Sequence, residues 1–301
     1  MVQKRAMAGQ RVPFVEKLRN GWQIFKEHRS SAWGGVQTYV TRYQMFSELL
    51  EEFTDTPVAS SRFLEVGCGQ RAIMPLLFAA HGAEAHGVDV EVPTYRMSLP
   101  LFVEIIRKNG FDRACKSLTR HIFFDRKFLN NLKLAFNLER LPYRDITIRV
   151  MDAAELDYPD NHFDLITSIA AFEHMADAET ALTHINRMLK PDGIAFIHIH
   201  LFPCLSGGHH LEWQRPDKEQ SKLVPPWDHL RENKYPVNTF LNKMKISDYQ
   251  AMFDRHTVPR RVTFSREGLS LTHLIPASLL ERYTVEDLTT NGAIFIFSKK
   301  E

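Results

Sequence analysis

The chain has 301 residues, of which 44% are hydrophobic, enough for a sizeable core in one large domain or in one domain with an insertion. Its formal net charge of +2 is close to neutral and excludes a global electrostatic case for nucleic acid or an anionic membrane. The three cysteines are too few and too scattered for a disulfide framework or a zinc cage, and they fit a reducing compartment.

The N-terminal region is predicted to be helical. Residues 1–21 carry charges throughout and lack an apolar core, which is not typical of a secretory signal. Apolar residues then recur at helical spacing from Tyr39 to Phe53. No apolar run in the chain approaches the ~20 residues of a membrane span. We therefore expect a soluble, cytoplasmic protein with an N-terminal helical cap over residues 1–60 and one domain over residues 61–301.

Strands and helices alternate from residue 62 onward. Predicted strands cover residues 62–66, 85–90, 146–150, 163–169, 194–200, 261–264 and 293–298. Predicted helices cover residues 71–80 and 246–256, and a third is capped by Asp177 and ended by a turn at residues 190–193. This alternation is typical of a doubly wound α/β fold, with a mainly parallel sheet and helices on both faces.

Two segments interrupt the alternation. Residues 93–145 are too long for a simple crossover, and apolar side chains spaced four apart from Phe124 to Phe136 predict an amphipathic helix there. Residues 93–144 carry 11 Lys or Arg and 4 Asp or Glu. We interpret this segment as a helical insertion with a solvated basic face; the alternative is a cap that recruits an acidic or phosphorylated substrate. Residues 202–240, rich in proline, glycine and histidine, are predicted to be an active-site loop.

A glycine turn directly follows the first predicted strand. Gly67 and Gly69 flank Cys68, and a helix signal follows. Only glycine enters positive φ freely and lets the backbone approach a ligand closely. A strand, a tight turn and a helix start together favour a nucleotide-like cofactor, and with Ala72 the turn also fits the dinucleotide fingerprint loosely.

Acidic residues stand at the ends of the next two strands. Asp89 closes the second strand, where a carboxylate can accept both hydroxyls of a ribose, and Glu91 is a second candidate for that role. Asp152 follows the third strand, where it can accept from the amine of an adenine, with Ala153 beside the ring. These positions predict that the cofactor carries a nucleoside.

Five short motifs follow one another at the strand boundaries. They are FLEVGCG at residues 63–69, GVD at 87–89, DA at 152–153, FDLI at 163–166 and LKPDG at 189–193. Their order and spacing resemble the class I S-adenosylmethionine-dependent methyltransferases over residues 60–200. The resemblance implies a seven-stranded, Rossmann-like sheet with S-adenosyl-L-methionine as the cofactor.

The resemblance also implies how the cofactor is held. Glu65 and the glycine turn would hold its methionine end, and residues 168–172 would lie near the sulfonium. The cofactor-binding residues implied in this way are Glu65, Gly67, Cys68, Gly69, Asp89, Val90, Asp152, Ala153, Ile169 and Ala170.

Histidines supply the candidates for a catalytic base. His209 and His210 lie in the predicted active-site loop and are favoured, and His174 follows the fourth strand. His198 and His200 share one face of a strand and are interpreted as core residues. A metal site built from loop residues was also considered, but no fixed ligand spacing is present, so no metal is predicted. Its ligands would be His209, His210, Glu212, Asp228 and His229.

The expected function is methyl transfer from S-adenosylmethionine to a small-molecule or carbohydrate acceptor, at oxygen. The stretch at residues 168–171 lacks the Asn/Asp-Pro-Pro-Tyr type motif of enzymes that methylate nucleobases or glutamine, which disfavours nucleic acid as a partner. One alternative is an NAD(P)-dependent oxidoreductase on a similar sheet. The other is a non-catalytic scaffold protein that keeps the cofactor site for stability or assembly.

Overall fold

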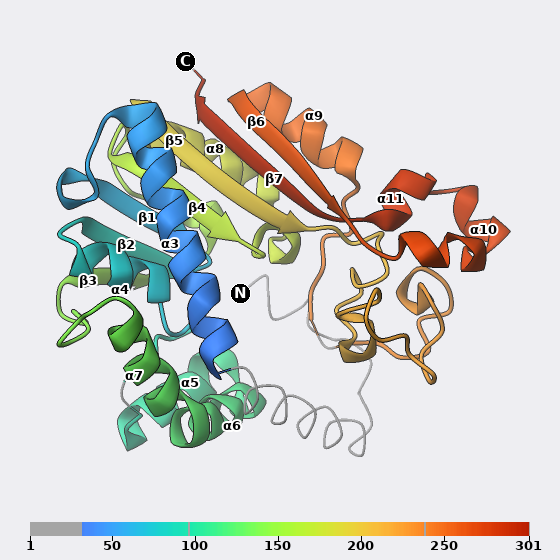
Figure 1. Ribbon diagram of the computed structural model, residues 1–301, viewed down its shortest axis with the longest axis horizontal. Coiled ribbons are helices and arrows are strands. Elements are labelled where there is room, and N and C mark those ends of the chain that lie inside the picture. Colours follow the sequence, from blue (N-terminus) through green and yellow to red (C-terminus); the bar gives the residue numbers. More distant parts are fainter. Residues whose placement is uncertain (1–31, 96, 238, 301) are drawn as a thin grey trace.

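The computed structural model describes residues 32–95, 97–237 and 239–300. Its centre is a seven-stranded sheet with the strand order β3-β2-β1-β4-β5-β7-β6 (Figure 1). Strands β1 to β5 are parallel, whereas β7 runs antiparallel to β5 and to β6. The predicted seven-stranded, mainly parallel sheet is confirmed. The strands are β1 (Arg62–Val66), β2 (Glu84–Asp89), β3 (Ile146–Val150), β4 (Phe163–Ile169), β5 (Leu189–His200), β6 (Thr257–Arg266) and β7 (Thr290–Lys299).

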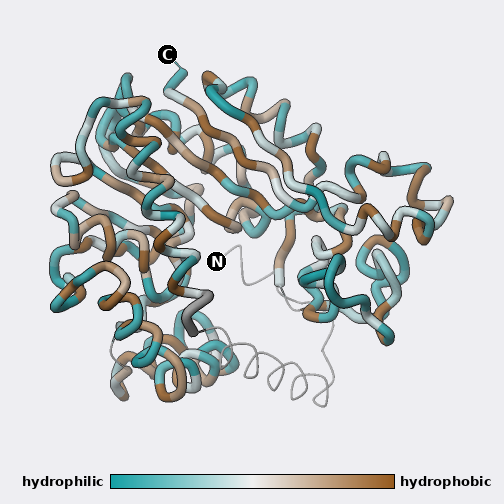
Figure 2. Tube along the Cα trace, viewed as in Figure 1, coloured by the Kyte–Doolittle hydropathy of each residue, from teal (hydrophilic) through white to brown (hydrophobic). Residues whose placement is uncertain are grey.

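Helices cover both faces of this sheet. In Figure 1, α3 (Ala32–Thr54) crosses the front of the sheet, whereas α8 (Ala178–Met188) and α9 (Ile246–His256) lie behind it. Successive strand residues point to opposite faces, so Phe63 packs with the α3 and α4 layer while Leu64 packs with the α8 and α9 layer. Figure 2 shows mostly hydrophobic colour along the central strands, as a sheet buried on both faces requires.

Strands β2, β6 and β7 differ from their predicted ranges by one to four residues at an end, and α4 and β5 differ at their starts for identifiable reasons. Helix α4 (Ile73–Ala80) begins later than residue 71, because the turn before it extends to Ala72, whose φ of 44° is left-handed. Strand β5 begins at Leu189, so residues 190–193 are an irregular start of the strand and not a turn before it. Lys190 anchors this irregularity, since its Nζ donates to Oδ1 of Asp164 at 2.6 Å.

The insertion after β2 is helical, as predicted. It consists of α5 (Leu99–Asn109), α6 (Phe111–Arg120), a π-helical segment (His121–Asp125) and α7 (Arg126–Ala135). Phe128 and Leu132 from the predicted apolar ladder are buried in the core on the α3 side of the sheet. The ladder therefore attaches the end of the insertion to the main fold.

Residues 202–240 and 269–289 share a small core of their own beside the sheet, at the right of Figure 1. Trp227 is fully buried, and its Nε1 donates to the carbonyl of Leu288 at 3.3 Å. Trp213 donates likewise to Val224 at 3.0 Å. These tryptophans pin the loop to the protein. The short helices here are η5 (Leu211–Trp213), η6 (Asp228–Leu230), η7 (Leu269–Leu274), α10 (Ala277–Leu280) and α11 (Val285–Thr289).

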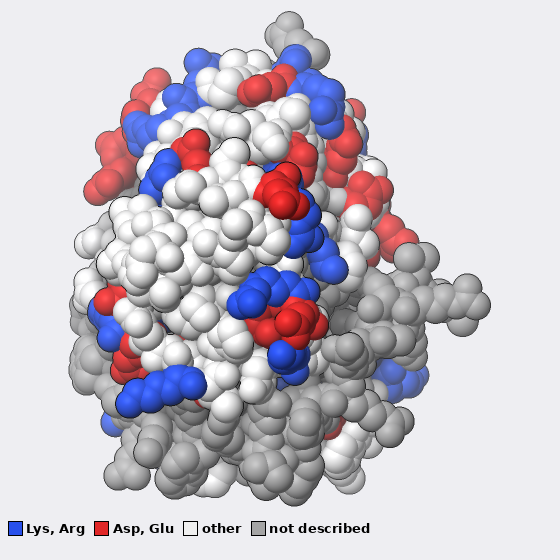
Figure 3. Space-filling view, turned by 90° about the vertical axis from the view of Figure 1, so that its right-hand side faces the viewer, with Lys and Arg blue, Asp and Glu red and all other residues white. Residues whose placement is uncertain are grey.

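The surface on this side carries both signs of charge. Figure 3 shows blue and red side chains interspersed around a broad uncharged area, with no field of a single sign among the described residues in view. No helix in the described part of the chain combines the length and apolarity that crossing a membrane requires.

Candidate active site

The glycine turn is held tightly against β2. The backbone N–H groups of Gly67 and Cys68 both donate to the carbonyl of Val88, at 2.7 and 3.1 Å. Gly67 has a φ of 80°, and a Cβ added there would lie 2.4 Å from Cβ of Ala171. Gly69 has a φ of 66°, but nothing lies within 4 Å of a Cβ added there. The turn is therefore packed at its start and open at its end.

Asp89 is tied directly to this turn. Its Oδ2 accepts from the backbone N–H of Gly69 at 2.7 Å, and its Oδ1 accepts from that of Glu91 at 2.8 Å. Burial raises the pKa of Asp89, while these backbone donors and Arg113 oppose the rise. Glu91 has a separate partner, because its carboxylate accepts from the guanidinium of Arg113.

Glu65 is a buried carboxylate near the end of β1. It is 7% exposed, and burial raises its pKa to about 8, although the charge of Arg42 lowers it. Asp89 lies close enough to raise that pKa further. Glu65 in β1 and Asp89 in β2 thus place two carboxylates near the ends of neighbouring strands. This arrangement favours a ligand that carries positive charge and hydroxyl groups.

The end of β3 places its acidic residue as expected. Asp152 caps the short helix η3 (Ala153–Glu155) by accepting from the backbone N–H of Ala154 at 3.0 Å. Ala153 is 8% exposed, whereas Val90, just beyond Asp89, is 41% exposed. An exposed apolar side chain beside a carboxylate at a strand end suits contact with a nucleoside ring.

These residues fit S-adenosylmethionine. The open space at Gly69 lets a ligand approach the backbone of the turn, and Glu65 and Asp89 offer carboxylates at separate strand ends. The carboxyl edge of a parallel sheet, where the strand order reverses between β1 and β4, is the usual binding place in such folds.

The insertion is fastened to the glycine turn, which the sequence did not indicate. Oε1 of Gln70 accepts from Oγ of Ser117 at 2.8 Å and from the guanidinium of Arg120 at 3.1 Å. Arg120 also pairs with the buried Asp125 at 3.3 Å. Because 47 residues separate Gln70 from Ser117, no local pattern could have revealed this contact.

The segment after β4 contacts the glycine turn and carries a further buried acidic residue. Ala171, which touches Gly67, precedes the short helix η4 (Phe172–His174). Glu173 in this helix is 1% exposed, and neither of its oxygens has a hydrogen-bond partner among the described residues. Burial raises the pKa of Glu173 to about 7, and the nearby backbone N–H groups of Glu173 and His200 oppose that rise.

The same segment contains the two remaining residues predicted to bind the cofactor. Ile169 ends β4, and Ala170 adopts a left-handed φ of 50° while its N–H donates to the carbonyl of His198 at 2.8 Å. Burial lowers the pKa of His198 to about 4. His198 is thus a neutral side chain of the strand at physiological pH.

His209 and His174 meet at this edge. Their ring centroids are 5.0 Å apart, and the ring of His200 lies 5.0 Å from that of His209. His209 has a φ of 56°, and burial with its histidine neighbours lowers its pKa to about 3. Nδ1 of His174 donates to the carbonyl of Phe240 at 2.8 Å. The structure therefore brings together two of the three predicted base candidates, one from each of two separate loops.

The third candidate, His210, has a local contact. Its Nδ1 accepts from the backbone N–H of Glu212 at 3.2 Å and so caps η5. Gly207 and Gly208 before it pack tightly, since a Cβ added to Gly208 would lie 2.6 Å from Cγ of His229. These glycines let the loop fold closely over the end of β5.

A buried network behind the histidines was not foreseen. Oγ of Ser206 lies 3.0 Å from Nε2 of His200 and 2.8 Å from each carboxylate oxygen of Glu267. Glu267 lies 61 residues further along the chain, so only the tertiary fold joins them. The network holds the start of the loop in place.

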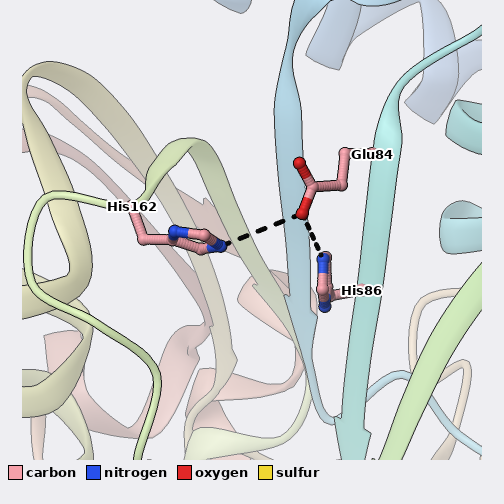
Figure 4. A group of neighbouring side chains, drawn as sticks. All are labelled: Glu84, His86 and His162. Atoms are coloured by element: carbon pink, nitrogen blue, oxygen red, sulfur yellow. Dashed lines mark hydrogen bonds and ion pairs between the residues drawn. The ribbon is translucent and has the colours of Figure 1, made fainter.

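Among the residues that the structure describes, two groups of side chains have the composition of a metal site. One, shown in Figure 4, joins Glu84, His86 and His162 at the amino ends of β2 and β4, on the sheet edge opposite Asp89. The other joins Glu173, His174 and His209 at the carboxyl edge. In the first group the carboxylate is already paired, because Glu84 accepts from Nε of Arg62 at 2.9 Å.

Comparison with known proteins identifies the family. A family model described as "Methyltransferase domain" matches residues 37–256. The ubiquinone/menaquinone biosynthesis C-methyltransferase UbiE of Shewanella oneidensis is 45% identical over 73 residues, which is 24% of this chain and 24% of that protein. The UbiE protein of Shewanella baltica matches over the same length with the same identity. The chain thus spans about a quarter of the curated relatives it matches.

Solved structures show more distant similarity. A putative S-adenosylmethionine-dependent methyltransferase from Listeria monocytogenes is 14% identical, with a TM-score of 0.46 over 86% of this chain and 99% of that one. The PH0226 protein of Pyrococcus horikoshii is 16% identical, with a TM-score of 0.44 over 88% and 92% of the two chains.

The fold and the site define a class I methyltransferase that uses S-adenosylmethionine as its cofactor. The chain belongs to the methyltransferase domain family, whose model matches well over half of it.

Proposed function

We propose that this enzyme methylates an oxygen atom of a small molecule or a sugar. The observation that carries the proposal is the contact between Ala171 and Gly67, which joins the glycine turn to the segment bearing Glu173 and His174. The cofactor region and a group of proton acceptors thus adjoin at one sheet edge. The mixed surface charge and the absent Asn/Asp-Pro-Pro-Tyr type motif support a small acceptor over nucleic acid.

The cofactor supplies an activated methyl group on a sulfonium, which is a good leaving group. In the proposed arrangement Glu65 and the turn at Gly67, Cys68 and Gly69 hold its methionine end. Asp89 with Val90 holds the ribose, and Asp152 with Ala153 flanks the adenine. Ile169 and Ala170 border the reacting centre. Support comes from the open space at Gly69 and from the carboxylates at two strand ends.

The acceptor hydroxyl has to lose its proton during transfer, and we assign this task to the histidines near η4. His209 stays neutral because its pKa is lowered to about 3, and each of the two histidines carries a ring nitrogen that can accept or coordinate. His210 is the weaker candidate, because its Nδ1 already caps η5. Orientation of the acceptor against the methyl group supplies most of the remaining rate, ~7 kcal/mol or more.

Two measurements test the proposal. Asp89→Asn should weaken binding of S-adenosylhomocysteine by roughly tenfold or more, because a charged hydrogen-bond acceptor is lost, and calorimetry would show it. Unchanged affinity would remove Asp89 from the site.

Labelled S-adenosylmethionine with a panel of sugars and hydroxylated small molecules should then give an O-methylated product. Cofactor binding without transfer to any acceptor would favour the scaffold alternative.

Methylation at carbon is a second candidate, favoured by the 45% identity with C-methyltransferases over 73 residues. NMR of the product decides between the two, since a methyl group on oxygen and one on carbon have different chemical shifts.

We also propose a cytoplasmic location, supported by the free thiols of Cys68, Cys115 and Cys204.

A further inference from the structure

Glu173, His174 and His209, called the Glu–His cluster below, contain polar atoms that lack partners. One ligand-capable atom of each residue lies within 4.8 Å of the other two. Both carboxylate oxygens of Glu173 and Nε2 of His209 are buried without a hydrogen-bond partner among the described residues. Buried polar atoms are nearly always paired, so three unpaired atoms in one place indicate that something else occupies the space between them.

His174 already has the orientation of a metal ligand. Its Nδ1 lies 2.8 Å from the carbonyl oxygen of Phe240. Because a carbonyl can only accept, the proton stands on Nδ1 and the lone pair on Nε2. Metal-binding histidines are typically fixed in this way, by a hydrogen bond from the ring nitrogen that does not bind the metal.

The charges around Glu173 also favour a cation. No Lys or Arg in the described part of the chain pairs with Glu173, which is 1% exposed. A buried carboxylate without a counter-charge is costly, and a metal ion removes that cost. The Glu84 group of Figure 4 differs, because the side chain of Glu84 is 52% exposed and already pairs with Arg62.

We infer that the Glu–His cluster binds a divalent transition-metal ion, with zinc as the expected occupant. Two imidazoles and one carboxylate form the ligand set of catalytic zinc sites that keep a fourth position open. Ligand atoms around zinc lie about 3.3 Å apart, so the separations within the cluster have to shorten by up to about 1.5 Å. Glu173 and His174 were not among the ligands considered from the sequence.

The ion would activate the acceptor, and this part of the inference rests on the proposed function. An acceptor hydroxyl that fills the open position has its pKa lowered by the positive charge, and its proton passes to solvent water. With the ion bound, His174 and His209 act on the acceptor proton through the metal as its ligands, and solvent water replaces them as the direct proton acceptor.

Zinc binding is measured on the full-length protein after dialysis against a chelator. Zinc sulfate is added, free ions are removed by gel filtration, and bound zinc per chain is determined by mass spectrometry. Glu173→Gln keeps the volume of the side chain, and His209→Asn suits the left-handed backbone, which asparagine tolerates. Glu84→Gln is the matched control, because it alters the other group of the same composition.

About one zinc ion per chain is expected in the unaltered protein and in Glu84→Gln. Affinity should fall by more than about tenfold in Glu173→Gln and His209→Asn. Absence of bound zinc, zinc that survives both substitutions, or zinc lost in Glu84→Gln would each overturn the inference. If His209→Asn does not fold, judged by thermal unfolding, Glu173→Gln decides.

A failure of the proposed methyl transfer can be told apart from a failure of zinc binding. Loss of S-adenosylhomocysteine binding or of methyl transfer by the zinc-loaded protein bears on the proposed function and leaves the zinc measurement standing. If zinc binds at the cluster but the chelated protein transfers methyl groups at the same rate, the activating role is wrong.

Discussion

The carboxyl edge of the sheet has two halves that satisfy their polar groups differently. In the first half, at the ends of β1 to β3, Asp89 and Asp152 each accept from the backbone N–H two residues further along the chain, and Asp89 also accepts from that of Gly69 in the turn after β1. In the second half, after β4 and β5, Glu173 and His209 have buried atoms without partners among the described residues. The two aspartates of the first half are paired as folded, whereas Glu173 and His209 of the second half have buried atoms left for a ligand.

The difference follows from how each half is built. The first half depends on backbone geometry within a few residues of a strand end, where the chain itself supplies the donors. The second half depends on side chains from separate loops that meet only in the folded protein, and such sites commonly bind ligands. Substitutions should therefore affect both stability and cofactor binding in the first half, and mainly ligand binding in the second.

Gly67→Ala should have the largest effect. Its Cβ would lie 2.4 Å from that of Ala171, at a φ of 80°. Left-handed strain and overpacking together should lower the free energy of unfolding by about 3–5 kcal/mol, which denaturant unfolding would measure. Gly69→Ala is the control, because its φ is 66° but nothing lies within 4 Å of the added atom. Equal stability of the two variants would contradict the role of the Ala171 contact.

The first half could be predicted from the sequence, and the second only in part. Strands β1, β3 and β4 have the predicted bounds, and residues that mark the site follow the apolar runs of β1 and β3, glycine in the first case and Asp152 in the second. His174 and His209 were each predicted as a candidate base, but the sequence did not predict that the two side chains meet. Contacts such as those of Glu267 with Ser206 and of Gln70 with Ser117 join distant segments, and no local periodicity encodes them.

Glu65→Gln should give a smaller effect that depends on pH. The pKa of Glu65 is raised from 4.5 to about 8 in the folded protein, so the folded state binds more protons than the unfolded state between these values. The stability of the cofactor-free protein should thus fall as pH rises through this window, by up to about 4 kcal/mol. Thermal unfolding should show Glu65→Gln equal to the unaltered protein near pH 4 and more stable at pH 8. Parallel curves would show that Glu65 is not buried as a carboxylate.

Ser117→Ala should have the smallest effect, and it tests whether the insertion supports the glycine turn. The substitution removes the hydrogen bond from Oγ of Ser117 to Gln70, and the free energy of unfolding should fall by about 1 kcal/mol. Arg120 still donates to Gln70, so S-adenosylhomocysteine affinity should fall by less than about fivefold.

Thr119→Ala is the matched control for this contact. Ser117 and Thr119 each donate to a backbone carbonyl four residues earlier in α6, at 2.9 Å in both cases, but only Ser117 is bonded to Gln70. The difference between the two variants in unfolding and in calorimetric binding therefore isolates the contact with the turn. If both variants bind S-adenosylhomocysteine equally, the insertion does not support the first half of the edge, and its helices serve the acceptor side or the surface alone.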